Sequence, residues 1–144
     1  MLELKINLWD ISDEDGVKAI TTNGVIDKQG KLVMGAGIAK AAAIRYPGLP
    51  LILADLLKIH GNIPFYVAEY NIISYPTKHN WRSPSSLKLI EQSAYILLKR
   101  IEEEELKHVF LPRPGCSLGG KDWETEVKPL IEPILPDTVT IVSL

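Results

Sequence analysis

Segments with strand periodicity alternate along the chain with segments of helical periodicity. This alternation constrains the fold most, because strand–helix–strand units build a parallel sheet and cover both of its faces with helices. We therefore predict an α/β fold with three layers, α/β/α, around a central mixed, largely parallel sheet. No repeat, low-complexity segment or linker divides the chain, so we expect one domain over residues 1–144. The expected strands are Leu2–Leu8, Val17–Thr22, Phe65–Val67, Ile72–Tyr75, Val109–Leu111 and Val139–Val142.

Four segments have helical spacing: 38–45, 51–60, 87–101 and 123–135. The third has the clearest apolar stripe. Ser83 suits the N-cap of that helix and Pro84 its first position, where the missing N–H costs nothing. The fourth contains Pro129 and Pro133. Because Pro129 would remove an internal hydrogen bond, we expect a kink or two short pieces there.

Composition narrows the class of function. The formal net charge of −2 argues against nucleic-acid binding over a broad basic surface, although a local basic patch stays possible. The single cysteine, Cys116, excludes an internal disulfide, and no Cys/His cluster has zinc-ligand spacing, so we expect no metal and no cofactor. The first residues lack a signal-peptide pattern and no apolar run approaches about 18 residues. We therefore expect a cytoplasmic protein without membrane contact.

Two glycine-rich loops each lie between a predicted strand and a predicted helix. Gly35-Ala36-Gly37-Ile38 opens a helix, whose first N–H groups and dipole suit a phosphate. The segment 115–120 has three glycines in six residues, which leaves backbone N–H groups free to surround an anion. Either loop alone is also explained as a tight turn or a flexible connector. Together they suggest one ligand with two phosphates.

Two common nucleotide motifs nearly match and fail. A dinucleotide fingerprint needs a third small residue three positions after Gly37, where this chain has Lys40. Gly115 to Lys121 has P-loop spacing, but Asp122 follows in place of the serine or threonine that would hold magnesium.

Four blocks in register resemble a macro domain. They are Thr21–Gly24, Val33–Ala39, Pro76–Arg82 and Leu111–Trp123. Within that superfamily the chain most resembles the branch of the terminal ADP-ribose protein glycohydrolase and the DNA ADP-ribosyl glycohydrolase antitoxins. The resemblance runs through nearly the whole chain in the same order.

The resemblance implies an ADP-ribose site. The first glycine loop would hold the diphosphate, the second would close over the phosphate and the distal ribose, and Asn23 would lie beside that ribose. Without the family, Asn23 is also explained as a turn residue that tolerates positive φ. Asn7 stands where many macro domains place an aspartate that accepts from the adenine amino group. The implied ligand-binding residues are Asn7, Leu8, Asn23, Gly35, Ala36, Gly37, Ile38, Gly115, Cys116, Ser117, Leu118, Gly119 and Gly120.

The resemblance also implies a catalytic lysine. In this branch a lysine matching Lys78 attacks the anomeric carbon of the distal ribose, and a lysine does so only as the free amine. From the sequence alone, a lysine before His-Asn-Trp-Arg is more often a surface residue. Trp81 and Arg82 resemble the antitoxin branch, where they would contact modified DNA. Their alternative roles are packing at the core edge for Trp81 and pairing with a carboxylate for Arg82.

One departure from the branch bears on activity. The protein glycohydrolase has an acidic residue where this chain has Gly119, and Asp122 could replace it, although helix capping is its simpler role. Cys116 is expected to be a small loop residue and not a nucleophile. We predict a metal-independent ADP-ribosyl glycohydrolase that acts on a modified protein or nucleic acid. The alternatives are an ADP-ribose 1″-phosphate phosphatase and a non-catalytic ADP-ribose reader.

Overall fold

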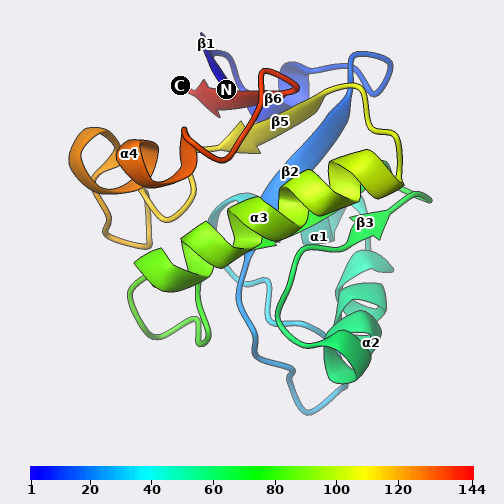
Figure 1. Cartoon of the computed structure of the whole chain (residues 1–144). Helices are drawn as coiled ribbons and strands as arrows, with labels where there is room; N and C mark the ends of the chain where they lie inside the picture. The colour runs from blue at the N-terminus through cyan, green and yellow to red at the C-terminus, as the bar shows by residue number, and fades with distance from the viewer.

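Six strands form one sheet at the centre of the computed structural model, which describes residues 1–144 (Figure 1). The strand order across the sheet is β1-β6-β5-β2-β4-β3. The bounds are β1 Leu2–Lys5, β2 Val17–Thr22, β3 Tyr66–Val67, β4 Ile72–Pro76, β5 Val109–Pro112 and β6 Val139–Ser143.

Five of the six strands run parallel. β1 pairs with β6, β6 with β5, β5 with β2 and β2 with β4 in the parallel sense, and only β3 is antiparallel to its neighbour β4. The predicted mixed, largely parallel sheet is confirmed. Because parallel strands end at one edge of a sheet, the loops that leave their carboxyl ends gather there and form the crevice typical of α/β domains.

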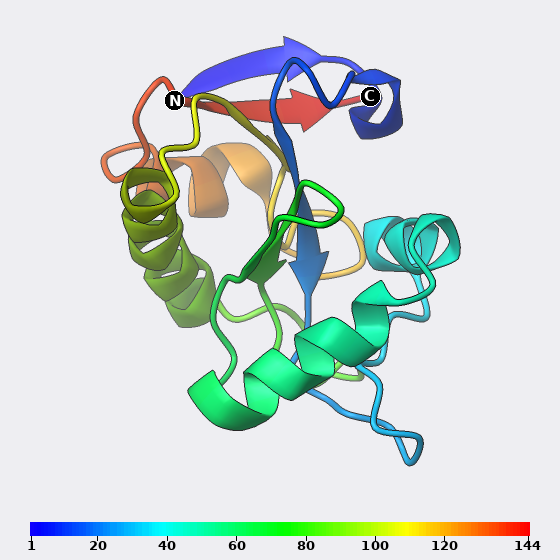
Figure 2. The same cartoon turned by 90° about the vertical axis from the view of Figure 1, so that its right-hand side faces the viewer.

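Helices cover both faces of the sheet (Figure 2). α3 (Leu87–Glu103) and the short α4 (Lys128–Ile131) lie on one face, and α1 (Gly37–Arg45) and α2 (Leu49–His60) lie on the other. Each face has its own apolar core, one packed with Ile90 and Leu97 of α3, the other with Ala42 of α1 and Leu53 of α2. The three-layer prediction is confirmed. None of the helices is both long and apolar enough to cross a membrane.

α3 begins later than predicted. Its N-cap is Ser86, whose hydroxyl accepts from the N–H of Leu89 at 3.2 Å, so the prediction of Ser83 as the cap and Pro84 as the first helical residue is wrong. The backbone before the helix is bound elsewhere. Ser85 donates its N–H to the carbonyl of Gly119 at 3.0 Å, and Ser86 donates to Thr77 at 2.9 Å. Long-range contacts therefore override the local capping signal.

β1 is shorter and more exposed than its alternation predicts. It ends at Lys5, and Leu8 belongs to a one-turn 3₁₀ helix, η1 (Leu8–Asp10). Leu2 and Leu4 are each 47% exposed, so the prediction of a half-buried strand over residues 2–8 is wrong. The reason is topological: β1 is an edge strand with β6 as its single neighbour.

The segment after β5 does form two short pieces, as the prolines predict. A π-helical turn, η2 (Trp123–Val127), runs directly into α4, with Pro129 in the first turn of α4. Asp122 caps η2, because its Oδ2 accepts from the N–H of Thr125 at 2.8 Å.

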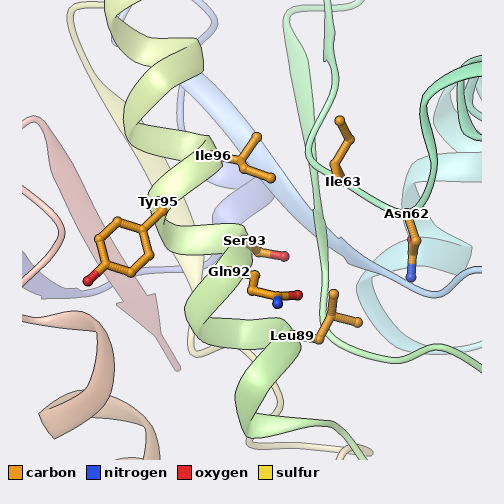
Figure 3. A pocket seen from close by; sticks show the side chains of 7 residues that line it. All are labelled: Asn62, Ile63, Leu89, Gln92, Ser93, Tyr95 and Ile96. Atoms are coloured by element: carbon orange, nitrogen blue, oxygen red, sulfur yellow. The ribbon is translucent and has the colours of Figure 1, made fainter.

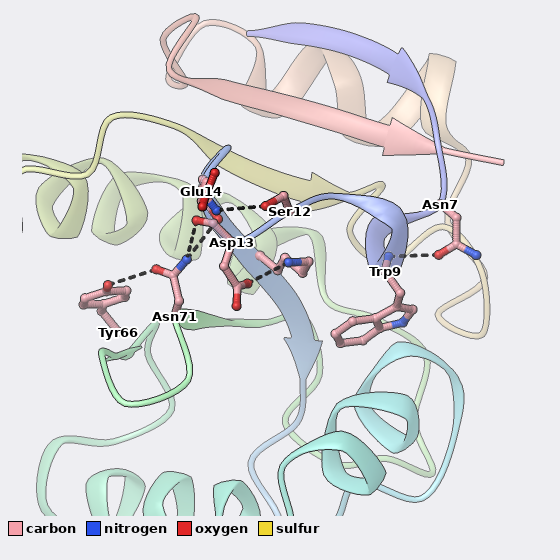
Figure 4. Close-up of polar contacts among 9 residues, drawn as sticks. Asn7, Trp9, Ser12, Asp13, Glu14, Tyr66 and Asn71 are labelled. Atoms are coloured by element: carbon pink, nitrogen blue, oxygen red, sulfur yellow. Dashed lines mark hydrogen bonds and ion pairs between the residues drawn. The ribbon is translucent and has the colours of Figure 1, made fainter.

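Polar contacts fix the opposite, amino-terminal edge of the sheet (Figure 4). Lys18 of β2 is buried and pairs with Asp13 at 2.9 Å. Asn71, in the left-handed region at φ 54°, donates to the carbonyls of Asp13 and Gly16 and accepts from the Tyr66 hydroxyl. These bonds satisfy the turns that enter β2 and β4, on the side of the sheet away from the glycine loops.

Candidate functional site

The first glycine loop enters α1 at the carboxyl-terminal edge of the sheet. Gly37 is the first helical residue and has φ 57°, a conformation that favours glycine. Ala36, the residue at the N-cap position, has no side chain able to cap the helix. The N–H groups of the first turn therefore have no acceptor within the helix and are open to an anion.

The second glycine loop closes partly on itself. Lys121 donates its N–H to the carbonyl of Gly115 at 2.9 Å, and Gly120 donates to Ser117 at 3.2 Å. Gly115 and Gly120 both have φ 76°, so the turn needs glycine at each end. Leu118, at the tip of the loop, is 66% exposed.

The two glycine loops face each other. A Cβ added to Gly37 would lie 3.4 Å from the Cδ1 atom of Leu118, so the Leu118 side chain lies beside Gly37. Both loops leave carboxyl-terminal ends of strands, and the contact brings segments that are about 80 residues apart in sequence to one place. The structure thus joins the two loops that sequence analysis had singled out separately.

Lys78 reaches the same place. It follows β4, it is half-buried, and its Nζ donates to the carbonyl of Leu118 at 3.4 Å. The backbone around it is held from two sides: Asn62 donates Nδ2–H to the carbonyl of Lys78 at 3.1 Å, and Gly24 donates its N–H to the carbonyl of His79 at 3.2 Å. The amine therefore extends from a fixed main chain.

A separate cavity of about 350 Å³ lies behind this segment, between α3 and the chain before β3 (Figure 3). Asn62, Leu89, Gln92 and Ser93 are among the residues that line it, and the residues implied as an ADP-ribose site are not. Ser93 donates its hydroxyl to the carbonyl of Pro76 at 2.8 Å, so this face also supports the end of β4.

Asn23 closes a loop. It is 9% exposed at the end of β2, its Nδ2 donates to the carbonyl of Val33 at 2.8 Å, and its Oδ1 accepts from the N–H of Val25 at 2.9 Å. Its φ is not positive, so the alternative of a left-handed turn residue is wrong. The bonds place the start of the 23–33 loop against its end, just before the first glycine loop.

A cavity of about 450 Å³ opens beside the two glycine loops. Five of the residues implied as an ADP-ribose site line it: Asn7, Leu8, Ile38, Cys116 and Ser117. Arg113, Lys121 and Trp123 also line it and were not predicted from the sequence. All three lie within the fourth block of the resemblance, so their place in the sequence was the available signal.

Trp123 forms part of the wall of this cavity, and Glu3 holds it. The indole Nε1–H donates to Glu3 at 2.9 Å, and Glu3 pairs with Lys128 at 2.8 Å. The hydrogen bond from Lys128 is the main reason why the pKa of Glu3 is below its usual value. The Arg113 guanidinium stacks 5.3 Å from the Trp123 ring centroid.

Gly119 is buried and has no room for a side chain. A Cβ there would overlap the hydroxyl of Ser85 and would lie 2.6 Å from the carbonyl oxygen of Gly115. The packing around residue 119 therefore leaves no room for the acidic side chain that the protein glycohydrolase has at this position. Asp122 caps η2, and its hydrogen bonds with Thr125 lower its pKa.

Cys116 has the surroundings of an inert loop residue. It is half-buried, its Sγ–H donates to the carbonyl of Pro114 at 3.4 Å, and burial raises the pKa of the thiol to about 11. A thiol is nucleophilic as the thiolate, so this environment works against nucleophilic attack at neutral pH.

Trp81 and Arg82 lie on the surface beside Lys78 in the chain. Trp81 is 46% exposed, and the Arg82 guanidinium stacks 4.7 Å from its ring centroid. Trp81 does not pack in the core and Arg82 has no carboxylate partner, so both alternative roles predicted for this pair are wrong.

The layers, the strand order and the facing glycine loops define the class of protein: the chain is a macro domain. It superposes on the macrodomain of Mycobacterium tuberculosis DarG with a TM-score of 0.78 and 27% identity, over 99% of this chain and 97% of that one. The structure of Thermosipho africanus DarTG in complex with ADP-ribose has a TM-score of 0.73 and 24% identity, over 88% of this chain and 37% of that one.

Within the macro domains, the chain resembles the branch of the DNA ADP-ribosyl glycohydrolases. It is 31% identical over 122 residues to the DNA ADP-ribosyl glycohydrolase of Mycobacterium tuberculosis, a match that covers 76% of this chain and 34% of that protein. The chain thus spans about a third of the length of that curated relative. No protein-family model matches the chain.

Proposed function

We propose that residues 1–144 act as one macro domain that binds ADP-ribose across the two glycine loops and hydrolyses the bond between ADP-ribose and DNA, with Lys78 as the nucleophile. The observation that carries this proposal is the meeting point at Leu118. Its side chain lies beside Gly37 of the first loop and its carbonyl accepts from Lys78, so the amine lies where the two phosphate loops converge.

Binding uses the open N–H groups of both loops. The first turn of α1 offers a partial positive charge and unpaired donors to one phosphate, and the tip of the second loop offers backbone donors to the other. The 450 Å³ cavity beside the loops has apolar walls from Leu8, Ile38 and Trp123 that suit a nucleoside base. A diphosphate that joins base and distal ribose would then direct the ribose toward Lys78.

The chemistry follows from an amine placed beside an anomeric carbon. The lone pair of Lys78 Nζ attacks C1″ of the distal ribose, the bond from C1″ to the modified base breaks, and its electron pair leaves with the base, which takes up the proton lost by Nζ. Water then adds to C1″ and the C1″–Nζ bond breaks, with its electrons and one proton of the water going to Nζ. The products are unmodified DNA, ADP-ribose and free lysine.

Two further observations support DNA as the modified macromolecule. The curated relatives carry the name DNA ADP-ribosyl glycohydrolase. Trp81 is exposed beside the nucleophile with Arg82 stacked on it, a pair that offers one aromatic face to a base and one cation to a phosphate.

A non-catalytic reader is the second candidate, and the packing of Gly119 favours it. A loop that has no space for an acid cannot supply one to process a lysyl adduct. A reader would use the same two glycine loops for binding and would leave the amine of Lys78 without a chemical role.

The two candidates differ in what Lys78→Ala removes. We would measure ADP-ribose release from ADP-ribosylated DNA, ADP-ribosylated protein and ADP-ribose 1″-phosphate, and ADP-ribose affinity by calorimetry. A glycohydrolase should act on the DNA, and Lys78→Ala should lower its rate by about a hundredfold or more while affinity stays within about threefold. Lys99→Ala, on the exposed face of α3, is the control. ADP-ribose binding without release from any of the three substrates would establish the reader, and release only from the phosphate monoester would establish a phosphatase.

A further inference from the structure

We propose that Asn7 faces the base through its amide nitrogen, so that the base subsite requires a hydrogen-bond acceptor at this position and does not select the adenine amino group. This inference rests on the proposed binding of ADP-ribose. It concerns which base the site accepts, a property separate from the chemistry at Lys78.

The orientation of the Asn7 side chain is set by its role as a helix cap. Asn7 is the N-cap of η1, and its Oδ1 accepts from the N–H of Trp9 at 3.0 Å (Figure 4). A backbone N–H can only donate, so the amide oxygen must face Trp9 and the NH₂ group must face away. The reverse orientation would bring two donors together and would uncap η1.

The residue that carries this NH₂ group lines the cavity. Figure 4 shows the amide nitrogen of Asn7 on the side of the amide away from Trp9, and Asn7 lines the 450 Å³ cavity together with Leu8. The neighbouring cations Arg113 and Lys121 can only donate as well. Asp122 is the one acidic side chain in the lining; its Oδ2 accepts twice from Thr125, and its Oδ1 is still able to accept. Arg113 and Lys121 therefore add donors to the wall that contains Asn7.

Base chemistry then gives the selectivity. The 6-amino group of adenine is a donor, so it would meet the Asn7 NH₂ group as donor against donor. Adenine can pair with that NH₂ only by offering a ring nitrogen, whereas hypoxanthine can offer its 6-oxo oxygen. An aspartate at residue 7 would keep the cap on Trp9 with one oxygen and turn its second oxygen, an acceptor, toward the base.

The test compares ADP-ribose with its hypoxanthine analogue, IDP-ribose, by calorimetry on the wild-type chain and on Asn7→Asp. Wild type should bind the two within about threefold or should prefer IDP-ribose. Asn7→Asp should shift the affinity ratio toward ADP-ribose by about tenfold or more. The new carboxylate oxygen would accept from the adenine amino group, whereas the 6-oxo oxygen of IDP-ribose has no hydrogen to donate and would leave that carboxylate unpaired.

Gln92→Glu, the same amide-to-acid change on the exposed part of α3, should leave the ratio unchanged, and thermal melts should show that both variants fold. A wild-type preference for ADP-ribose of about tenfold, or a ratio that Asn7→Asp does not move, would overturn this inference alone. If neither nucleotide bound the wild-type chain, the proposed function would fail, and this inference would fail with it.

Discussion

The side-chain amine of Lys78 lies 3.4 Å from the main-chain oxygen of Leu118, a residue forty positions further along the chain. The side chain of Leu118 in turn lies beside Gly37. Three segments from three different strand ends therefore meet at one residue.

The first prediction concerns the reaction intermediate. If Lys78 attacks C1″, borohydride added during turnover should reduce an imine form of the adduct and attach ADP-ribose to this residue, which mass spectrometry would locate. Without an acid at residue 119, breakdown of the adduct should be the slow step, so the trapped form should make up a large fraction of the enzyme. A trace amount would contradict the slow step, and full turnover in Lys78→Ala would contradict the adduct itself. EDTA should leave the rate unchanged, since amine attack needs no Lewis acid.

A second prediction separates the two glycines of the first loop. A Cβ on Gly35 meets no atom within 4 Å, so Gly35→Glu should leave unfolding stability within about 0.5 kcal/mol of wild type. Its carboxylate should repel the diphosphate and weaken ADP-ribose binding by about tenfold or more. Gly37→Glu should weaken binding too, but φ 57° adds a backbone cost of about 1 kcal/mol. Undiminished affinity in both variants would remove this loop from the site.

The third prediction concerns the missing acid. Gly119→Asp should destabilise the domain by about 2 kcal/mol in urea unfolding, because its Cβ would overlap Ser85 and crowd the carbonyl of Gly115. Gly35→Asp, at the exposed glycine, should cost far less and serves as the control. If Gly119→Asp were neutral in stability and raised turnover, the packing argument would be wrong and the acid would simply be absent.

A fourth prediction addresses the DNA contact. Trp81→Ala should lower kcat/KM on ADP-ribosylated DNA by about tenfold or more, since stacking on a base contributes about 1–3 kcal/mol. Affinity for free ADP-ribose should not change, because the exposed Trp81 ring does not line the cavity beside the glycine loops. Tyr95→Ala, which removes another exposed aromatic side chain, should change neither value. Equal loss on modified DNA and on free ADP-ribose would indicate a general defect of the site.

The features of the fold that depend on local sequence pattern were predictable from the sequence. Hydrophobic periodicity predicted the α/β layers and the parallel sheet, and Pro129 predicted the change from η2 to α4. The predictions were wrong where contacts between segments far apart in the sequence determine the local structure. The exposure of Leu2 and Leu4 depends on β1 being an edge strand, and the cap of α3 at Ser86 depends on hydrogen bonds from Ser85 and Ser86 to other loops.

The candidate site shows the same division. The glycine loops and Lys78 could be proposed from the four blocks, but their meeting at Leu118 is a tertiary contact that no local pattern contains. The orientation of the Asn7 amide is also a product of the fold, since it requires the η1 turn that brings Trp9 N–H to its oxygen. A residue type alone does not say which of its two polar atoms faces a ligand.

The last prediction concerns Glu3, which ties β1 to η2 and α4. Its pKa lies below the ordinary value of 4.5, chiefly because it accepts a hydrogen bond from Lys128. The hydrogen bond from Trp123 and the nearby charge of Arg113 lower the pKa further. Because the pKa of Glu3 is lower in the folded state, the ionised carboxylate contributes fully to stability at any pH above the pKa of the unfolded state. This contribution is lost as pH falls through the pKa of the folded state. Glu3→Gln should thus be less stable than wild type at pH 7, by about 1 kcal/mol given the partial exposure of the side chain.

The difference should start to shrink as pH falls below the unfolded pKa of about 4.3, and it should vanish below the lower pKa of the folded state, where wild type loses the same charge. Urea unfolding from pH 3 to pH 7 measures it, with Glu69→Gln as the control, since Glu69 is exposed and forms no ion pair. Glu3→Gln should also weaken ADP-ribose binding slightly at pH 7, because Glu3 fixes the Trp123 wall of the cavity. A stability difference that stayed constant across this pH range would show that Glu3 acts through packing and not through its charge.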